Sequence, residues 1–260
     1  MPEGLQATLN ARALPAAHRR FHECLRPGLR VLDVGCGTGA ITRDVAAAVA
    51  PDGEAIGIDA NRMLINEARM SSATVPNLSF EEGDIYRLDH PKRFDIVHAA
   101  RVLQWLASPI DALRSMASAT KAGGLVIVLD YNHEKIEWLP EPPPSMRCFY
   151  EAFLRWRAEA GMDNAIADHL EALMKQVGLE AVRTTAHHER TRRSDADFLQ
   201  RASLWADVAA TRGHQMVRDG AISEAQRASA EADYRAWIRE QAEAVELYLL
   251  SVDARRPRVA

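Results

Sequence analysis

Three glycines that follow directly on a short apolar run limit the possible folds of this chain more than any other feature. The apolar run covers residues 30–34, and the glycines are Gly35, Gly37 and Gly39. Glycine reaches backbone conformations with positive φ at little cost, so the chain can turn tightly and leave room for a ligand. The Ala- and Val-rich residues 40–50 then indicate a helix, whose first N–H groups lack intrahelical partners. The junction predicts a strand–turn–helix unit that binds a ligand where the helix begins.

Two other interpretations of this junction stay open at this point. Gly35, Gly37 and Ala40 also satisfy the G-x-G-x-x-[GA] pattern of dinucleotide-binding folds. A tight turn without a ligand is the simpler alternative, because a glycine cluster alone marks turns in general. The surrounding residues have to distinguish these possibilities.

The first half of the chain alternates short apolar runs with helical segments. The expected strands are residues 30–34, 54–58, 78–81, 94–98 and 125–129. Short strands that are apolar on both faces and joined by helices are typical of a parallel sheet covered on both sides. With 260 residues, 47% of them hydrophobic, the chain can bury one substantial core but not two large ones. We therefore predict an α/β fold with a doubly wound sheet.

The second half of the chain is richer in helices and indicates a cap on this core. We expect residues 1–130 to form a cofactor-binding core with an N-terminal lid helix around residues 18–25. Residues 131–260 are expected to form a helical substrate cap together with the last helix and two strands of the core sheet. The cap helices are predicted at about residues 131–177 and 194–240, and the two strands at 179–185 and 245–252.

Acidic residues near the expected strand ends favour one ligand over another. Asp33 lies two residues before Gly35, where its charge would oppose a pyrophosphate and attract an ammonium group. Asp59 follows Gly39 by twenty residues, which suits a carboxylate that binds a ribose hydroxyl pair. Asp84 follows the third strand and would place a further carboxylate near an amino-bearing ring of the ligand. Three acidic loop residues without a basic phosphate clamp favour S-adenosyl-L-methionine over NAD.

Four segments in this order resemble class I S-adenosylmethionine-dependent methyltransferases. They are residues 31–39, 57–59, 82–84 and 121–124, with the sequences VLDVGCGTG, GID, EGD and KAGG. The matches fall within residues 28–130, about half of the chain. The layout is most similar to the small-molecule methyltransferases of the ubiquinone-biosynthesis-like group, which includes natural-product tailoring enzymes of secondary metabolism.

The resemblance implies a Rossmann-like seven-stranded sheet whose last strand is antiparallel. It also implies that the cofactor is S-adenosyl-L-methionine and the product S-adenosyl-L-homocysteine. In such a site Asp33 would lie near the ammonium group, Asp59 would hold the ribose, and the residues around Asp84 would meet the adenine. The implied cofactor-binding residues are Asp33, Gly35, Cys36, Gly37, Gly39, Asp59, Ala60, Asp84, Ile85, Ala100 and Arg101.

The expected reaction needs few catalytic side chains. The methyl group moves by in-line displacement to an O, N or C atom of a small acceptor, so the protein mainly aligns the partners and excludes water. A general base is needed only if the acceptor must lose a proton, and His133, after the fifth strand, is the candidate. A loop histidine in solvent is the alternative. The expected acceptor-binding residues are Tyr131, Asn132, Trp138 and Phe153, although Phe153 also belongs to a helical stripe typical of a core.

Composition and the remaining motifs exclude several classes. The net charge of −4 argues against a dedicated nucleic-acid or anionic-membrane binder, and His98-Ala99-Ala100-Arg101 stands where nucleic-acid amino-methyltransferases carry Asn/Asp-Pro-Pro-aromatic.

His18 and His22 have helical spacing, but no third metal ligand is identifiable, so we expect a solvated helix face and no metal. The three cysteines are widely spaced, and the sequence has no signal-peptide layout and no long apolar run, which predicts a cytoplasmic protein. We expect a monomer or homodimer.

Two rival functions follow from the same residues. An NAD(P)-dependent oxidoreductase with a Rossmann fold explains the glycines and Asp59, but Asp33 would then oppose the cofactor phosphates. A non-catalytic S-adenosylmethionine-binding protein would share the glycine turn without needing an acceptor pocket. We predict a methyltransferase, because several motifs occur in the correct strand–turn–helix order.

Overall fold

The computed structural model describes residues 14–258, which divide into two compact units. The sheet unit contains residues 14–131, 166–187 and 249–258, and the helical unit contains residues 132–165 and 188–248. Residues 1–13 and 259–260, which belong to the expected core and cap, lie outside the described residues.

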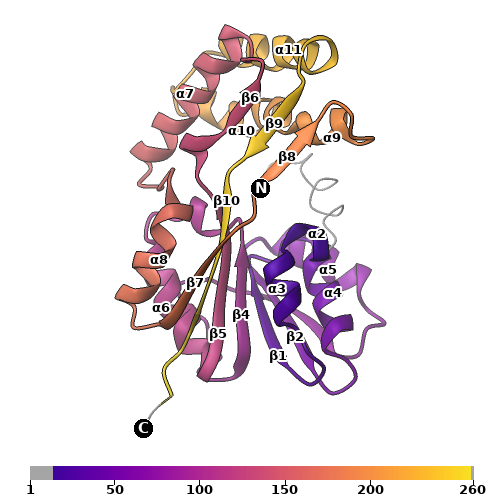
Figure 1. The fold of residues 1–260 in the computed structure, drawn as a ribbon, viewed down its shortest axis with the longest axis vertical. Coiled ribbons are helices and arrows are strands. Elements are labelled where there is room, and N and C mark those ends of the chain that lie inside the picture. The colour runs from indigo at the N-terminus through magenta and orange to yellow at the C-terminus, as the bar shows by residue number, and fades with distance from the viewer. Residues whose placement is uncertain (1–13, 259–260) are drawn as a thin grey trace. The chain divides into compact units, whose positions relative to one another are not determined.

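A seven-stranded sheet with the order β3-β2-β1-β4-β5-β10-β7 forms the centre of the sheet unit (Figure 1). Its strands are β1 (Arg30–Val34), β2 (Glu54–Asp59), β3 (Leu78–Glu82), β4 (Phe94–Ala100), β5 (Thr120–Tyr131), β7 (Glu180–Ala186) and β10 (Leu249–Arg255). The first five strands run parallel, and β10 is antiparallel to both of its neighbours, β5 and β7. The predicted doubly wound sheet with an antiparallel last strand is confirmed.

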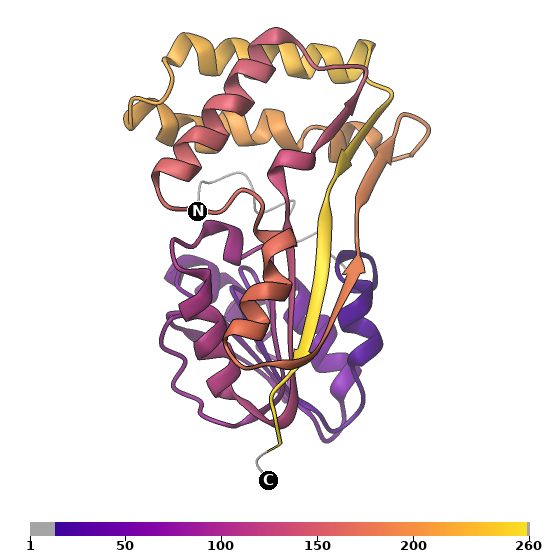
Figure 2. The same cartoon turned by 60° about the vertical axis from the view of Figure 1, so that its left-hand side comes forward.

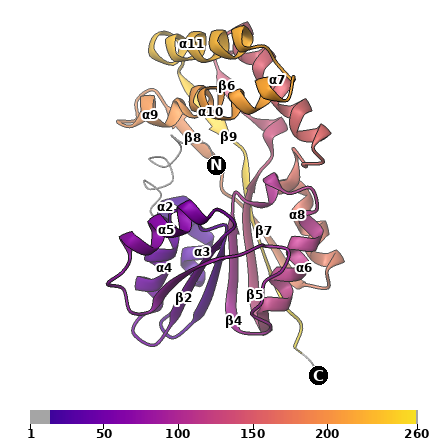
Figure 3. The same cartoon turned by 180° about the vertical axis from the view of Figure 1, so that it is seen from behind.

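Helices cover both faces of this sheet (Figure 3). One face packs against α6 (Pro109–Ala119) and α8 (Ile166–Gln176), with Leu113, Met116 and Leu170 fully buried there. The other face is covered by α2 (Leu14–Ala17), α3 (Arg19–Cys24) and α4 (Ala40–Val49). The helix α5 (Arg62–Ser71) packs against β3 through Ile65, Ala68 and Phe80, and the short helix η1 (Leu103–Trp105) follows β4.

The alternation of side chains along the strands decides which residues meet. In β1, Leu32 and Val34 belong to the core beneath α6 and α8, whereas Val31 belongs to the core beneath α3 and α4. Successive residues of a strand point to opposite faces, so Asp33 shares the face of Val31. By the same rule His98 of β4 shares the face of its neighbour two residues earlier, Ile96. Asp33 and His98 are also direct partners in the register of β1 and β4.

The helical unit combines three long helices with a small antiparallel sheet. The helices are α7 (Pro144–Glu159), α10 (Leu204–Arg218) and α11 (Glu224–Glu240), with the short elements η2 (His133–Lys135) and α9 (Phe198–Ala202). The sheet has the order β6-β9-β8, formed by β6 (Glu137–Leu139), β9 (Ala244–Leu247) and β8 (Glu189–Arg192). The helix α11 begins at a capping box in which Ser223 accepts from the backbone N–H of Gln226.

Two boundaries differ from the sequence-based expectation. The single strand predicted at residues 245–252 is wrong, because the structure has two strands there, β9 and β10, that belong to different sheets. The helix α8 lies along the sheet beside β7 and β10 (Figure 2), so residues 166–187 belong to the sheet unit. The helical insertions are therefore 132–165 and 188–248, and not 131–177 and 194–240. Within residues 14–258, no helix combines the length and apolar composition that crossing a membrane requires.

Candidate active site

The turn between β1 and α4 needs glycine at the three predicted positions. The φ angles of Gly35, Gly37 and Gly39 are 71°, 57° and 75°, in the left-handed region that other residues avoid. A Cβ atom on Gly35 would lie 2.4 Å from a methyl carbon of Val102, and one on Gly39 would lie 2.4 Å from the ring of Phe80. The backbone therefore passes too close to its neighbours for any side chain at either position.

The carboxylate of Asp59 holds the end of β2 against this turn. Its Oδ2 accepts a hydrogen bond from the backbone N–H of Gly37 at 2.9 Å, and its Oδ1 accepts one from Asn61 at 2.8 Å. The N–H groups of Gly35 and Cys36 both donate to the carbonyl of Ile58. Burial and two neighbouring carboxylates raise the pKa of the Cys36 thiol well above its usual value, so the thiol is neutral. Asp59 and the glycine turn are thus brought together as predicted.

The other expected cofactor residues lie at the ends of the neighbouring strands. Asp84 is exposed after β3 and accepts a hydrogen bond from the backbone of Tyr86 at 2.9 Å, and Ile85 is half-buried against the sheet core. Ala60 is exposed after β2, and Ala100 ends β4. All eleven predicted residues therefore lie at the carboxyl ends of four adjacent parallel strands, the place where open α/β sheets bind ligands. Their contact with a cofactor stays a prediction.

Asp33 is more deeply buried than the sequence suggested. Its side chain is on the α4 face, and the residue is 3% exposed. Oδ2 accepts a hydrogen bond from the hydroxyl of Thr42 in α4 at 2.7 Å, and Oδ1 lies 2.7 Å from Nδ1 of His98. Sequence reasoning missed this pairing with His98. A usable signal exists, because each is a polar residue flanked by apolar neighbours within its strand.

The expectation that His18 lies on a solvated helix face is wrong. His18 is fully buried, and both of its ring nitrogens have partners in the sheet unit. It stands between α2 and α3 with a φ of −157° and a ψ of 75°, outside helical geometry. Its spacing to His22 is therefore not that of two residues on one helix face.

Arg101, directly after β4, combines backbone strain with burial. Its φ is 60°, which is uncommon for a residue with a side chain, and it is 7% exposed. Its Nε donates to the hydroxyl of Tyr131 at the end of β5, at 2.9 Å. Strained, buried polar residues at strand ends cluster at functional sites, and this pair spans the ends of two strands.

The predicted base, His133, is buried in the aromatic core of the helical unit. It is 8% exposed, so the interpretation as a loop histidine in solvent is wrong. Its ring is edge-on to the rings of Phe153 and Trp205, with centroids 5.9 Å and 6.1 Å away. Burial lowers the pKa of His133 well below its usual 6.5, and the charge of Arg157 lowers that pKa further. The imidazole is therefore neutral at pH 7.

The remaining predicted acceptor residues are divided between the two units. Tyr131 belongs to the sheet unit, whereas Asn132, Trp138 and Phe153 belong to the helical unit. Asn132 is the residue that caps η2. Its side-chain oxygen accepts a hydrogen bond from the backbone N–H of Glu134. Trp138 donates from Nε1 to the hydroxyl of Tyr234 at 3.1 Å, and Phe153 is 1% exposed. Phe153 thus packs within the core of the helical unit, and its contact with an acceptor stays a prediction.

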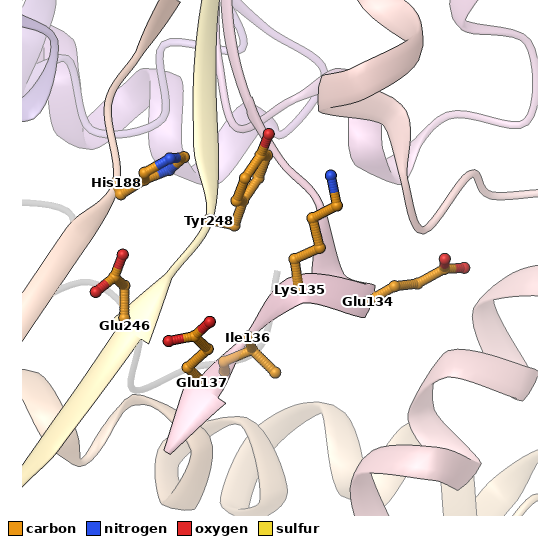
Figure 4. Close-up of a pocket in the computed structure, with 7 residues that line it drawn as sticks. All are labelled: Glu134, Lys135, Ile136, Glu137, His188, Glu246 and Tyr248. Carbon is orange, nitrogen blue, oxygen red and sulfur yellow. The ribbon is translucent and has the colours of Figure 1, made fainter. Parts of the chain in front are cut away.

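A cavity of about 440 Å³ lies in the helical unit beside the small sheet (Figure 4). Three glutamates line it, from η2, β6 and β9, together with Lys135 and the rings of His188 and Tyr248. The ammonium of Lys135 lies 4.5 Å from the centre of the Tyr248 ring, and the ring of His188 lies 4.3 Å from it. None of the predicted acceptor-binding residues lines this cavity.

The sequence matches the family described as "Methyltransferase domain" over residues 25–185, more than half of the chain. The chain belongs to this methyltransferase-domain family. The predicted resemblance to class I S-adenosylmethionine-dependent methyltransferases is thereby confirmed.

Relatives of this methyltransferase-domain chain match part of its length. The ubiquinone/menaquinone biosynthesis C-methyltransferase UbiE of Ectopseudomonas mendocina is 37% identical over 112 residues, which cover 42% of this chain and 44% of that protein. Trans-aconitate 2-methyltransferase of Deinococcus radiodurans is 31% identical over 134 residues, which cover 51% of this chain and 50% of that protein. The match thus spans no more than half the length of either relative.

Solved structures extend the likeness in fold to nearly the whole methyltransferase-domain chain. Phosphoethanolamine N-methyltransferase 2 of Haemonchus contortus, in complex with phosphomonomethylethanolamine and S-adenosylhomocysteine, has a TM-score of 0.59 at 15% identity, covering 99% of this chain and 54% of that one. The [4+2]-cyclase SpnF has a TM-score of 0.58 at 20% identity, covering 96% of this chain and 85% of that one. At such identities these likenesses show the fold alone.

Proposed function

We propose that this chain is an S-adenosylmethionine-dependent methyltransferase that transfers a methyl group to an O, N or C atom of a small-molecule acceptor. The observation that carries the proposal is the pair of carboxylates, Asp33 and Asp59, on either side of the glycine turn in a member of the methyltransferase-domain family. This arrangement suits a ligand with a ribose and a positive charge. A nicotinamide dinucleotide would instead place its pyrophosphate near Asp33.

Each proposed cofactor contact fits the hydrogen-bonding capacity of the residue concerned. The two oxygens of Asp59 each accept one backbone N–H, and each carboxylate oxygen has a second lone pair for a ribose hydroxyl. Asp33 likewise accepts one hydrogen bond on each oxygen and keeps capacity for an ammonium group. Asp84 and Ile85, at the end of β3, are proposed to meet the adenine. Gly35, Gly37 and Gly39, whose positive φ shapes the turn, are proposed to pass under the methionine part.

The proposed reaction requires the protein to align the cofactor with the acceptor and to exclude water. For some acceptors the protein must also remove a proton from the acceptor. When bound, S-adenosylmethionine supplies the methyl group and the sulfonium leaving group. Arg101 and Tyr131 lie at the ends of β4 and β5 and are proposed to orient the acceptor. His133 is proposed as the base. Because its pKa is lowered it is neutral but weakly basic, which suits an acceptor whose proton is already acidic.

The relatives narrow the acceptor class that is worth testing first. The names of the two relatives describe methylation of a carbon in quinone biosynthesis and methylation of trans-aconitate, a small carboxylic acid. We propose that this chain acts on a small molecule and on neither nucleic acid nor membrane, which its net charge of −4 supports. We also propose that it is a cytoplasmic monomer or homodimer. Asn132, Trp138 and Phe153 remain proposed acceptor-side residues.

The test is a transfer assay with cofactor carrying an isotope-labelled methyl group. The purified chain is incubated with labelled S-adenosylmethionine and separate panels of quinols, phenols, small carboxylic acids and amines, and products are separated by mass spectrometry. The expected result is label in one acceptor class together with S-adenosylhomocysteine, lost in Asp59→Ala. Binding of the cofactor without transfer to any acceptor, or rearrangement of an acceptor without label, would replace the proposal by a binding or non-methylating role.

A further inference from the structure

Five buried polar side chains form a continuous hydrogen-bonded chain that runs from β10, through His18 between α2 and α3, to β1 and α4. Ser251 Oγ of β10 lies 2.7 Å from Nε2 of His18, whose Nδ1 lies 2.9 Å from Nε2 of His98. His98 Nδ1 lies 2.7 Å from Asp33, which also accepts from Thr42. Each of the five residues is at most 3% exposed. All of them belong to the sheet unit.

One arrangement of protons satisfies the whole chain when Asp33 is ionised and both histidines are neutral. The carboxylate can only accept, so His98 must donate from Nδ1, which leaves its Nε2 as an acceptor. His18 must then donate from Nδ1, which leaves its own Nε2 to accept from the hydroxyl of Ser251. The tautomer of each imidazole is therefore set by the next group in the chain.

The N-terminal helices enclose this chain of hydrogen bonds. The ring of Phe21 in α3 stacks on the imidazole of His98, with centroids 3.9 Å apart and planes within 7°. Arg20 makes two hydrogen bonds to Asp253 of β10, at 2.7 Å and 3.0 Å. Hydrogen bonds that are shielded from water are stronger than those at the surface. A buried donor or acceptor that loses its partner therefore costs more free energy than an exposed one.

The charged groups around His18 favour its neutral form. Burial is the main cause that lowers the pKa of His18 well below 6.5. Positive or titratable groups on the surrounding elements lower that pKa further. They are His98 on β4, His187 after β7, Arg101 after β4 and Arg20 on α3.

We propose that His18 and His98 are positioning residues, which hold the Asp33 carboxylate in the orientation that the cofactor's ammonium group requires and so couple docking of the N-terminal helices to cofactor binding. The inference rests on the proposed function, in which Asp33 meets that ammonium group. Loss of the imidazole at 18 leaves Nε2 of His98 without its donor and opens space beside the ring, so the His98 ring and the Asp33 carboxylate that it contacts are held less firmly. By linkage, a cofactor that favours the ordered carboxylate must favour the docked helices by the same factor.

Calorimetric titration with S-adenosylhomocysteine tests the positioning role. His18→Ala is expected to weaken binding about five- to thirtyfold, the equivalent of one to two buried hydrogen bonds. His18→Gln is the rescue variant, because its amide can donate to His98 and accept from Ser251, and we expect affinity within about threefold of wild type. His22→Ala is the matched control, since His22 is exposed four residues further on, and wild-type affinity is expected. Wild-type affinity in a folded His18→Ala would overturn the inference.

Two further measurements keep the inference testable if His18→Ala does not fold. Ser251→Ala leaves Nε2 of His18 without its donor, so weaker binding is expected, and unchanged affinity would overturn the inference. Amide hydrogen exchange of residues 14–24 in wild type is expected to slow when S-adenosylhomocysteine is added; unchanged exchange at saturation would refute the coupling. A wild-type chain that does not bind S-adenosylhomocysteine at all would instead contradict the proposed function.

Discussion

The carboxylate of Asp59 accepts a hydrogen bond from the backbone N–H of Gly37 at 2.9 Å, so the side chain that ends β2 fixes the turn that follows β1. One residue therefore has two tasks in the proposed site. It holds the glycine turn in shape, and it offers its remaining lone pairs to the cofactor ribose. We therefore expect cofactor affinity to be sensitive to replacement of Asp59.

Replacement of Asp59 is expected to weaken cofactor binding strongly. Asp59→Ala removes a charged acceptor from both the turn and the ribose, so affinity for S-adenosylhomocysteine should fall about ten- to hundredfold, as expected for lost hydrogen bonds to a charged group. Isothermal titration calorimetry measures the change. Asp52→Ala, at an exposed carboxylate before β2, is the control and should bind like wild type. An Asp59→Ala protein with undiminished affinity would remove Asp59 from the site.

A methyl group at Gly39 is expected to destabilise the fold more than one at Gly28. Both glycines have positive φ, 75° and 84°, but a Cβ at Gly39 meets the Phe80 ring at 2.4 Å, whereas one at Gly28 meets nothing within 4 Å. Gly28→Ala should therefore cost about 1 kcal/mol of backbone strain, and Gly39→Ala about 2–4 kcal/mol, strain and overpacking together. Urea unfolding gives both values. If the free energy of unfolding falls equally in the two variants, the contact with Phe80 is relieved without an energetic cost.

Stability is expected to fall as the pH drops below about 6.5. The folded chain keeps His18 and His133 neutral, because burial lowers the pKa of both, whereas the unfolded chain takes up protons near pH 6.5. Each such histidine contributes a slope of up to about 1.4 kcal/mol per pH unit between the unfolded and folded pKa. Chemical unfolding between pH 7.5 and pH 5, a range chosen about the ordinary histidine pKa, should show a shallower slope for His18→Gln and an unchanged slope for exposed His22→Gln. A wild-type slope in His18→Gln would contradict the buried neutral state.

His133→Gln is expected to lower turnover and to leave cofactor affinity unchanged. If the imidazole accepts the acceptor's proton, its replacement by an amide removes that base while filling much of the same space. The steady-state rate with the acceptor found in the transfer assay measures turnover, and calorimetry with S-adenosylhomocysteine measures affinity. Trp205→Phe, which changes the neighbouring aromatic packing, is the control for a general loss of order in this core. An unchanged rate in His133→Gln would exclude His133 from the mechanism.

Much of the sheet unit could be predicted because its signals are local. The apolar run before Gly35, the three glycines and the helix that follows lie within twenty residues and specify one strand–turn–helix unit. The division of residues 244–255 between two sheets was not predictable in this way. No glycine or proline interrupts the sequence there, and Tyr248, between the two strands, accepts a backbone hydrogen bond from Asn132, which is distant along the chain.

The acidic residues of the site were predicted, but the histidines that hold one of them were not. Asp33 and Asp59 each lie two residues from a glycine, in a recognisable order. The contacts of His18 reach 80 residues along the chain to His98 and 233 residues to Ser251, distances at which sequence spacing carries no information. The spacing of His18 and His22 also misled, because the chain leaves helical geometry at His18.

The central claim is that the site binds an S-adenosyl compound and not a nicotinamide dinucleotide. The most direct test is a pair of calorimetric titrations of the wild-type chain, one with S-adenosylhomocysteine and one with NADH, in the same buffer. The proposed site predicts saturable binding of S-adenosylhomocysteine, weakened in Asp59→Ala, and no measurable binding of NADH. Saturable binding of NADH with no heat from S-adenosylhomocysteine would contradict the account.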